Sequence, residues 1–156
     1  MEPIANKIHK ALINKQKTLA VAESCTGGLL SNLLTRLAGS SKYYILGVVT
    51  YSNRAKENIL KIPRSIIQKN GAVSKPVAEM MAEHIRRLAK TDYGIGVTGI
   101  AGPGGASPKK PKGTVFIAVS SSSKKVCKKF GFRGNRNLVQ KKAALKALNL
   151  LLAWLI

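Results

Sequence analysis

The sequence predicts a single α/β domain with three layers, α/β/α, in which a mostly parallel sheet is covered by helices on both faces. Two observations lead to this class. Short β-branched or apolar runs alternate with longer segments in which apolar residues recur at helical spacing. The chain has 156 residues, 45% of them apolar, which is enough for one compact core. We therefore expect one domain over residues 1–156.

The first half of the chain alternates helices and strands. Residues 2–17 place apolar side chains at helical spacing between lysines. TLAVA is a short apolar run, and YYILGVVTY is β-branched and aromatic, which is typical of strands. The leucines between these runs share one helical face, and Gly39 is placed to end that helix. The predicted strands are Thr18–Ala22 and Tyr43–Tyr51, and the predicted helices are 2–17, Thr26–Ala38, 54–61 and Pro63–Gly71.

The second half begins with a helix for which Ser74 is the expected N-cap, with an apolar stripe from Val77 to Leu88. A long segment rich in glycine and proline, Thr98–Gly113, then separates two predicted strands. Long ordered loops in compact domains are often functional. The remaining predicted elements are strands 93–98, 113–120 and 125–132 and the helix 138–155.

The charge is strongly unbalanced, with 27 basic residues against six acidic ones and a net charge of +21. Such a charge favours polyanions. However, 20 of the 27 basic residues are lysines, so the chain lacks the arginines that usually recognise bases and phosphates specifically. Aromatic residues make up only 5% of the chain, so few rings are present on which the bases of a single strand could stack. We expect only non-specific, salt-sensitive binding to nucleic acid.

Other function classes are disfavoured by composition. No apolar run is long enough to cross a bilayer. The two cysteines, Cys25 and Cys127, are too few for a disulfide scaffold or a zinc site. We expect a cytoplasmic protein with reduced thiols and no membrane association.

The stretch AESCTGG carries the first candidate site, because it joins a predicted strand to a predicted helix. Ligands of open α/β sheets bind beyond the carboxyl ends of the strands. Ser24 would stand there beside free backbone N–H groups, and the two glycines allow close approach of a ligand. A structural role remains open at this stage, in which Ser24 or Thr26 only caps the helix. Cys25 is a rival nucleophile, although a small buried cysteine is commoner.

A nucleophilic serine needs a base, and neither histidine is well placed. His84 lies on an apolar helical stripe and His9 lies among lysines. The alternative is a neutral lysine. Lys56 falls in the first turn of a short helix if Ser52 or Asn53 caps it, and there the helix dipole disfavours a positive charge. An ordinary surface role for this lysine also remains open.

The glycine-rich run GVTGIAGPGG gives a weaker signal. Glycine loops that follow strands can cradle phosphates through backbone N–H groups. This run matches neither the Walker pattern nor GxGxxG.

Taken together, the blocks TLAVAESCTGGLLSNLLTRLAGSS, GVVTYSNRAK, GAVSKPVAEMMAE, GVTGIAGPGG and KPKGTVFIAV resemble the CinA C-terminal domain family in its stand-alone form. The resemblance runs from about residue 4 to 152. Members of this family include nicotinamide-nucleotide amidohydrolases. The resemblance therefore implies hydrolysis of the carboxamide of nicotinamide mononucleotide to nicotinate mononucleotide and ammonia, with no metal or other cofactor.

The resemblance also implies roles for residues. Ser24 would be the nucleophile and Lys56 its proton acceptor, with N–H groups near Thr26–Gly28 stabilising the oxyanion. The substrate-binding residues that it implies are Thr26, Gly27, Gly28, Tyr51, Thr98, Gly99, Gly102, Gly104, Gly105 and Arg136.

One block departs from the family pattern, in which phenylalanine, glycine, aspartate and arginine are followed by a second arginine. In FRGNRNLVQKKA, Asn135 replaces the aspartate and Gln140 stands at the second arginine, while Arg136 is kept. Glutamine is a poor substitute for a guanidinium that forks a phosphate. Two alternatives therefore stay open: a domain that binds a nucleotide or a protein partner without turnover, and a basic nucleic-acid-associated protein. We also expect a homodimer or a higher homo-oligomer.

Overall fold

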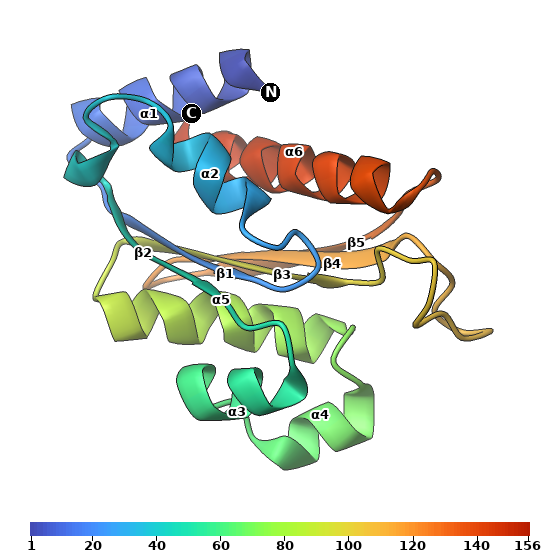
Figure 1. The fold of residues 1–156 in the computed structure, drawn as a ribbon. Helices are drawn as coiled ribbons and strands as arrows, with labels where there is room; N and C mark the ends of the chain where they lie inside the picture. Colours follow the sequence, from blue (N-terminus) through green and yellow to red (C-terminus); the bar gives the residue numbers. More distant parts are fainter.

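The computed structural model describes the backbone of residues 1–156 and every side chain except that of Glu2. A five-stranded sheet in the order β2-β1-β3-β4-β5 lies between two helical layers (Figure 1). The strands are β1 (Leu19–Glu23), β2 (Tyr44–Val49), β3 (Tyr93–Gly99), β4 (Thr114–Ser120) and β5 (Lys125–Gly131). The helices are α1 (Glu2–Asn14), α2 (Leu29–Thr35), α3 (Asn53–Leu60), α4 (Arg64–Asn70), α5 (Lys75–Ala89) and α6 (Arg136–Leu155), with a 3₁₀ turn at Ser40–Lys42.

The predicted three-layer α/β class is confirmed, and the sheet is mixed. β1 pairs in parallel with β2 and with β3, whereas β3–β4 and β4–β5 are antiparallel. Helices connect β1 to β2 and β2 to β3, as parallel crossovers require. β3, β4 and β5 are joined without a helix, so these strands return in the opposite direction, and the sheet is less parallel than expected.

Each face of the sheet is covered by its own helices (Figure 1). α1, α2 and α6 lie on one face and form the larger core, in which Ile8, Leu12, Leu151 and Leu155 are buried together. α3, α4 and α5 lie on the other face, where Val77, Met81 and Ile85 of α5 pack against the sheet. None of the described helices is long and apolar enough to span a bilayer.

Several element ends differ from the predicted ones. The first helix ends at Asn14, and the helix expected from Thr26 begins only at Leu29, because Gly27 and Gly28 have positive φ and form a turn. The last helix begins at Arg136, where the side chain of Asn135 accepts from the Leu138 N–H and caps it. Ser74 occupies the expected N-cap position of α5, but its hydroxyl donates to the Gly71 carbonyl at 2.8 Å and caps nothing.

Close packing of α5 on β3 depends on glycine. A Cβ at Gly96 would lie 2.4 Å from the carbonyl oxygen of Ala78 and 2.6 Å from the backbone nitrogen of Ala82. These atoms belong to the helix backbone and cannot rotate away, so a side chain here must push the helix off the sheet.

We predict that Gly96→Ala lowers the free energy of unfolding by about 1–3 kcal/mol, because it overpacks the α5–β3 contact. Urea denaturation measures this loss. Gly104→Ala is the matched control, because a Cβ at Gly104 meets no atom within 4 Å of the described chain. Its effect should stay within about 0.5 kcal/mol. Equal stabilities of the two variants would contradict the packing argument.

Candidate active site

The carboxyl ends of β1, β2 and β3 meet at one edge of the sheet. The chain passes from β1 to β2 on one side and then to β3 on the other, so this edge is the switch point where ligands of open sheets bind. A cavity of about 270 Å³ opens there. The charged side chains that line it, Lys56 and Arg136, are both cationic. The cavity therefore suits an anionic ligand.

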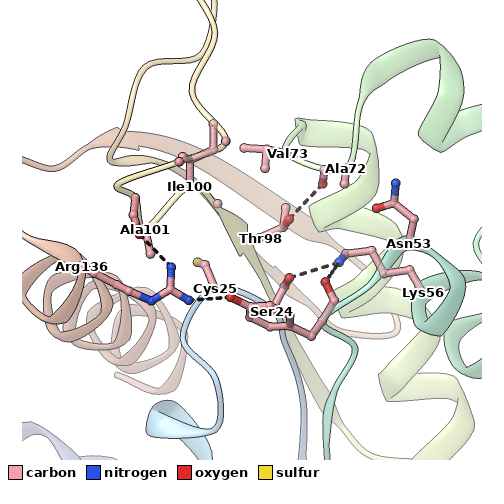
Figure 2. Close-up of a pocket in the computed structure, with 15 residues that line it drawn as sticks. Ser24, Cys25, Asn53, Lys56, Ala72, Val73, Thr98, Ile100, Ala101 and Arg136 are labelled. Atoms are coloured by element: carbon pink, nitrogen blue, oxygen red, sulfur yellow. Dashed lines mark hydrogen bonds between the residues drawn. The ribbon is translucent and has the colours of Figure 1, made fainter.

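The structure brings Ser24 and Lys56 together (Figure 2). The hydroxyl of Ser52 accepts from the Ala55 N–H at 3.0 Å and starts α3, which places Lys56 in the first turn. The Lys56 side chain is only 1% exposed, and its Nζ lies 3.1 Å from the Oγ of Ser24. The same Nζ donates to the carbonyls of Thr50 at 2.8 Å and Tyr51 at 3.3 Å. The surface role left open for Lys56 is thus excluded.

The surroundings of Lys56 bring its neutral form within reach near neutral pH. Burial lowers its pKa from the usual value near 10.5 to about 8. The charged amine donates to Ser24 Oγ and to the carbonyls of Thr50 and Tyr51. A neutral amine has two N–H donors and one lone pair, so once a proton is lost the two carbonyls can keep both donors and the lone pair can accept from the Ser24 hydroxyl. The pair is therefore arranged for transfer of the serine proton to the lysine.

Cys25 lines the same cavity but is a poor nucleophile. It is 3% exposed, and burial raises its pKa to about 12. The thiol is therefore protonated at neutral pH, whereas the reactive form of cysteine is the thiolate. Between the two neighbouring candidates, the geometry favours Ser24.

Glu23 is a functional residue that the sequence reasoning missed. It ends β1 and is completely buried, and its carboxylate accepts from the backbone N–H groups of Gly28 at 3.1 Å and Leu30 at 3.1 Å. Ser31 donates to it through both its backbone N–H at 2.8 Å and its hydroxyl at 2.5 Å. This carboxylate caps α2 and fixes both ends of the turn that carries Ser24. An acidic residue at the end of an otherwise apolar strand was the available signal, because a buried carboxylate must find donors.

This cap corrects two expectations for the turn. Neither Ser24 nor Thr26 caps the helix. The N–H of Gly27 donates to the Ser24 carbonyl at 3.0 Å and that of Gly28 to Glu23, so neither is free to stabilise an oxyanion. Among the described residues, the N–H groups of Cys25 and Thr26 donate to no other residue. Of these two residues only Cys25 lines the cavity with Ser24, so its N–H remains available for that role.

Thr26, Gly27 and Gly28 also do not line the cavity that contains Ser24. They border a separate groove on the far side of the turn, together with Gln140 and Lys141 of α6. The hydroxyl of Thr26 is buried and lacks a hydrogen-bond partner among the described residues. The structure therefore places these three residues apart from the cavity with Ser24, and their expected contact with the substrate stays a prediction.

The other expected binding residues do border the cavity, namely Tyr51, Thr98, Gly99, Gly102, Gly104, Gly105 and Arg136. Arg136 joins two walls, because it donates to the carbonyl of Gly102 at 2.8 Å and to the hydroxyl of Tyr51 at 2.5 Å. The hydroxyl of Thr98 donates to the Ala72 carbonyl at 2.9 Å (Figure 2). Thr98 therefore holds the wall of the cavity in place.

The two departures from the family pattern have different structural meanings. Asn135 accepts from the Leu138 N–H at 2.9 Å, which is a capping contact that an aspartate makes equally well. Gln140 instead donates through Nε2 to the Cys25 carbonyl at 2.9 Å. It thus holds the nucleophile turn from α6, outside the cavity with Ser24.

Neither histidine lies at this cavity. His84 contacts the Leu60 carbonyl at 2.6 Å, and the ring of His9 packs edge-on against Tyr43 with the ring centres 5.4 Å apart. Among the residues that the structure describes, no three His, Cys, Asp or Glu side chains form a group that could hold a metal ion.

The fold and the site define an α/β/α domain with a buried Ser–Lys pair at the switch point of its sheet. Comparison with protein families then identifies it: the model of the CinA C-terminal domain matches residues 1–155, and the chain belongs to this family.

Named relatives agree with this assignment. A CinA-like protein of Syntrophus aciditrophicus is 46% identical over 155 residues, which is 99% of this chain and 37% of that protein. The chain thus spans about two-fifths of the length of such relatives.

Solved structures match over nearly the full chain. The competence damage-inducible protein A of Klebsiella pneumoniae superposes with a TM-score of 0.94 at 35% identity, covering 97% of this chain and 94% of that one. The competence/damage inducible protein CihA of Agrobacterium tumefaciens superposes with a TM-score of 0.95 at 34% identity, covering 97% and 93%.

We predict that Glu23→Ala lowers the free energy of unfolding by about 2–4 kcal/mol, because four donors lose a buried charged acceptor. Glu23→Gln should cost less, since one oxygen remains. Thermal unfolding monitored by circular dichroism measures both. Glu57→Ala, at a half-exposed glutamate of α3, controls for the loss of a negative charge and should change stability by no more than about 0.5 kcal/mol. Loss of stability in the control to the same extent would argue for a net-charge effect.

Proposed function

We propose that this domain hydrolyses the carboxamide of nicotinamide mononucleotide to nicotinate mononucleotide and ammonia. The observation that carries the proposal is the buried Lys56 Nζ, 3.1 Å from Ser24 Oγ, with its pKa lowered to about 8. The substrate is the one that the resemblance to nicotinamide-nucleotide amidohydrolases implies, and the cationic side chains that line the cavity suit its phosphate.

In the first half of the reaction, Ser24 Oγ attacks the carboxamide carbon while its proton passes to Lys56. The N–H group of Cys25, which lines the cavity, is available to the oxyanion. As the tetrahedral intermediate collapses, the C–N bond breaks and Lys56 returns the proton to the nitrogen, which leaves as ammonia.

In the second half, a water molecule attacks the resulting ester at Ser24. Lys56 accepts a proton from this water and returns it to Ser24 Oγ as the ester C–O bond breaks, which restores the serine hydroxyl. The product acid loses its remaining proton to solvent and leaves as the carboxylate. The positive charge of the pyridinium ring already activates the carboxamide of this substrate.

The alternative is a domain that binds the nucleotide without turning it over. Gln140 favours it, because its amide is directed at the Cys25 carbonyl and supplies no cation to the substrate. The Ser24–Lys56 geometry opposes it, since the reacting pair is assembled as hydrolysis requires.

The test is ammonia release from nicotinamide mononucleotide by the purified protein in the presence of a chelator. We predict that Ser24→Ala reduces the rate by about a thousandfold or more while the melting temperature is kept. Cys25→Ser is the matched control at the neighbouring position and should retain activity within about tenfold. Release by Ser24→Ala at the wild-type rate would exclude Ser24 as the nucleophile. Binding of the nucleotide with no release by the folded wild type would favour the alternative.

We further predict that kcat/KM increases with pH up to about 8 and then levels off. Lys56 must be neutral to accept a proton, and its pKa of about 8 means that the neutral fraction rises about tenfold per pH unit below that value. Lys56→Arg should abolish turnover, because arginine does not give up its proton at these pH values. Lys61→Arg, at an exposed position just after α3, is the control. A flat profile from pH 6 to 9, or an active Lys56→Arg variant, would exclude Lys56 as the base.

A further inference from the structure

The charge of the chain is divided unevenly along the sequence. Asp92 is the last acidic residue, and residues 93–156 contain ten lysines and two arginines with no aspartate or glutamate. These residues form β3, β4, β5, α6 and the connections between them. These residues therefore carry +12 of the net charge of +21, without compensation from their own segment.

The two sides of β5 differ in how far their basic residues are paired with carboxylates. Lys125 points to the α5 side, where its Nζ lies 3.3 Å from Glu83, and Arg87 of α5 pairs with the same carboxylate. Cys127 packs on this side too, against residues of α5. Basic residues on the α5 side are thus partly neutralised.

On the α6 side of β5, the described cations form no ion pair with a described carboxylate. Phe130 packs on the core that contains α6, so Lys128, two residues away on the strand, shares its side of the sheet. The Nζ of Lys146 lies 5.9 Å from the centre of the Phe130 ring. Lys142 is one helical turn before Lys146, and its Nζ donates to the Arg133 carbonyl at 2.8 Å. We name Lys128, Arg133, Lys142 and Lys146 the β5–α6 basic ridge.

The ridge has the properties of a phosphate-binding surface. Lys128, Arg133 and Lys146 are exposed and Lys142 is half-buried, and no ion pair joins any of the four to a described carboxylate. Like charges held close together on a rigid strand and helix repel one another, and an anionic partner with regularly spaced charges relieves that repulsion.

The chemistry of the ridge favours a duplex over a single strand. Binding of single strands relies on aromatic side chains on which bases stack. The aromatic rings here, Phe130 and Phe132, are half-buried and stack on each other at 5.5 Å with their planes 6° apart. The cations are mostly lysines, which act as point charges toward phosphate and do not read base edges bidentately.

We propose that the β5–α6 basic ridge binds double-stranded nucleic acid through its phosphate backbone, without sequence preference. This surface is separate from the Ser24–Lys56 cavity, and the proposal does not depend on the proposed amidase activity.

The test compares two variants that each lose three positive charges. The ridge variant is Lys128→Gln, Lys142→Gln and Lys146→Gln. The control variant is Lys7→Gln, Lys10→Gln and Lys15→Gln, at exposed positions in and just after α1. Binding of both proteins and of the wild type to a fluorescent 20-base-pair DNA duplex is measured by anisotropy between 50 and 200 mM salt. Melting temperatures confirm folding.

We expect the ridge variant to bind the duplex about tenfold or more weakly at 50 mM salt, and the slope of log affinity against log salt to fall by about 2–3. The control should lose less than about threefold in affinity and less than about one in slope. If the triple ridge variant does not fold, Lys128→Gln with Lys146→Gln, both at exposed positions, provides the same comparison with a slope change of about 1–2.

Equal losses in the ridge and control variants would show that only net charge matters and would overturn the proposal. Tighter binding to a single strand of the same length, or to vesicles containing anionic lipid, would also overturn it in favour of another partner. Comparison with an RNA duplex of the same length identifies which duplex is preferred. Ammonia release by the ridge variant should be unchanged, because none of its substituted residues lines the Ser24–Lys56 cavity.

Discussion

The buried carboxylate of Glu23 is the interaction on which the rest of the site depends. A charged group removed from water is stable only if donors surround it, and here the start of α2 supplies them. The hydrogen-bond network of Glu23 also includes β2, because the Tyr44 hydroxyl donates to the Ser31 hydroxyl at 2.6 Å and that hydroxyl donates to Glu23. Burial raises the pKa of Tyr44 to about 12 and keeps this phenol a donor. One carboxylate thus links β1, α2 and β2.

Lys56 is also a buried ionisable side chain, but its surroundings differ from those of Glu23. The Glu23 carboxylate accepts from four donors, whereas burial lowers the pKa of Lys56 and two carbonyls accept from its amine. The surroundings of the two buried residues therefore differ: Glu23 is held by the backbone around it, and Lys56 lies beside the hydroxyl of Ser24. Ser24 lies in the short turn between Glu23 and Leu29, where it follows Glu23 in the chain and contacts Lys56 in space.

The fold class and the Ser24–Lys56 pair could be predicted from the sequence because both depend on local patterns. Apolar periodicity marks the strands and helices, and a capping serine places Lys56 in the first turn of α3. The directions of β4 and β5 could not be predicted in this way, since direction depends on how connections pack. The partners of Gly27, Gly28 and Gln140 also escaped prediction. Their contacts join residues far apart in the chain, as when Gln140 reaches Cys25, and no local pattern records such a contact.

The turn that carries Ser24 has consequences for how this chemistry is inherited. Its backbone is tied to β3 through the Ser24 N–H and the Val97 carbonyl at 2.9 Å, to α2 through Glu23, and to α6 through Gln140. Only the hydrogen bond between Gly28 and Glu23 lies within the heptapeptide AESCTGG; the partners Val97 and Gln140 lie outside it. Grafting those seven residues onto another scaffold would therefore transfer the side chains without their geometry. The unit that evolution can move or duplicate is the whole domain, and a short motif match in an unrelated protein says little about its chemistry.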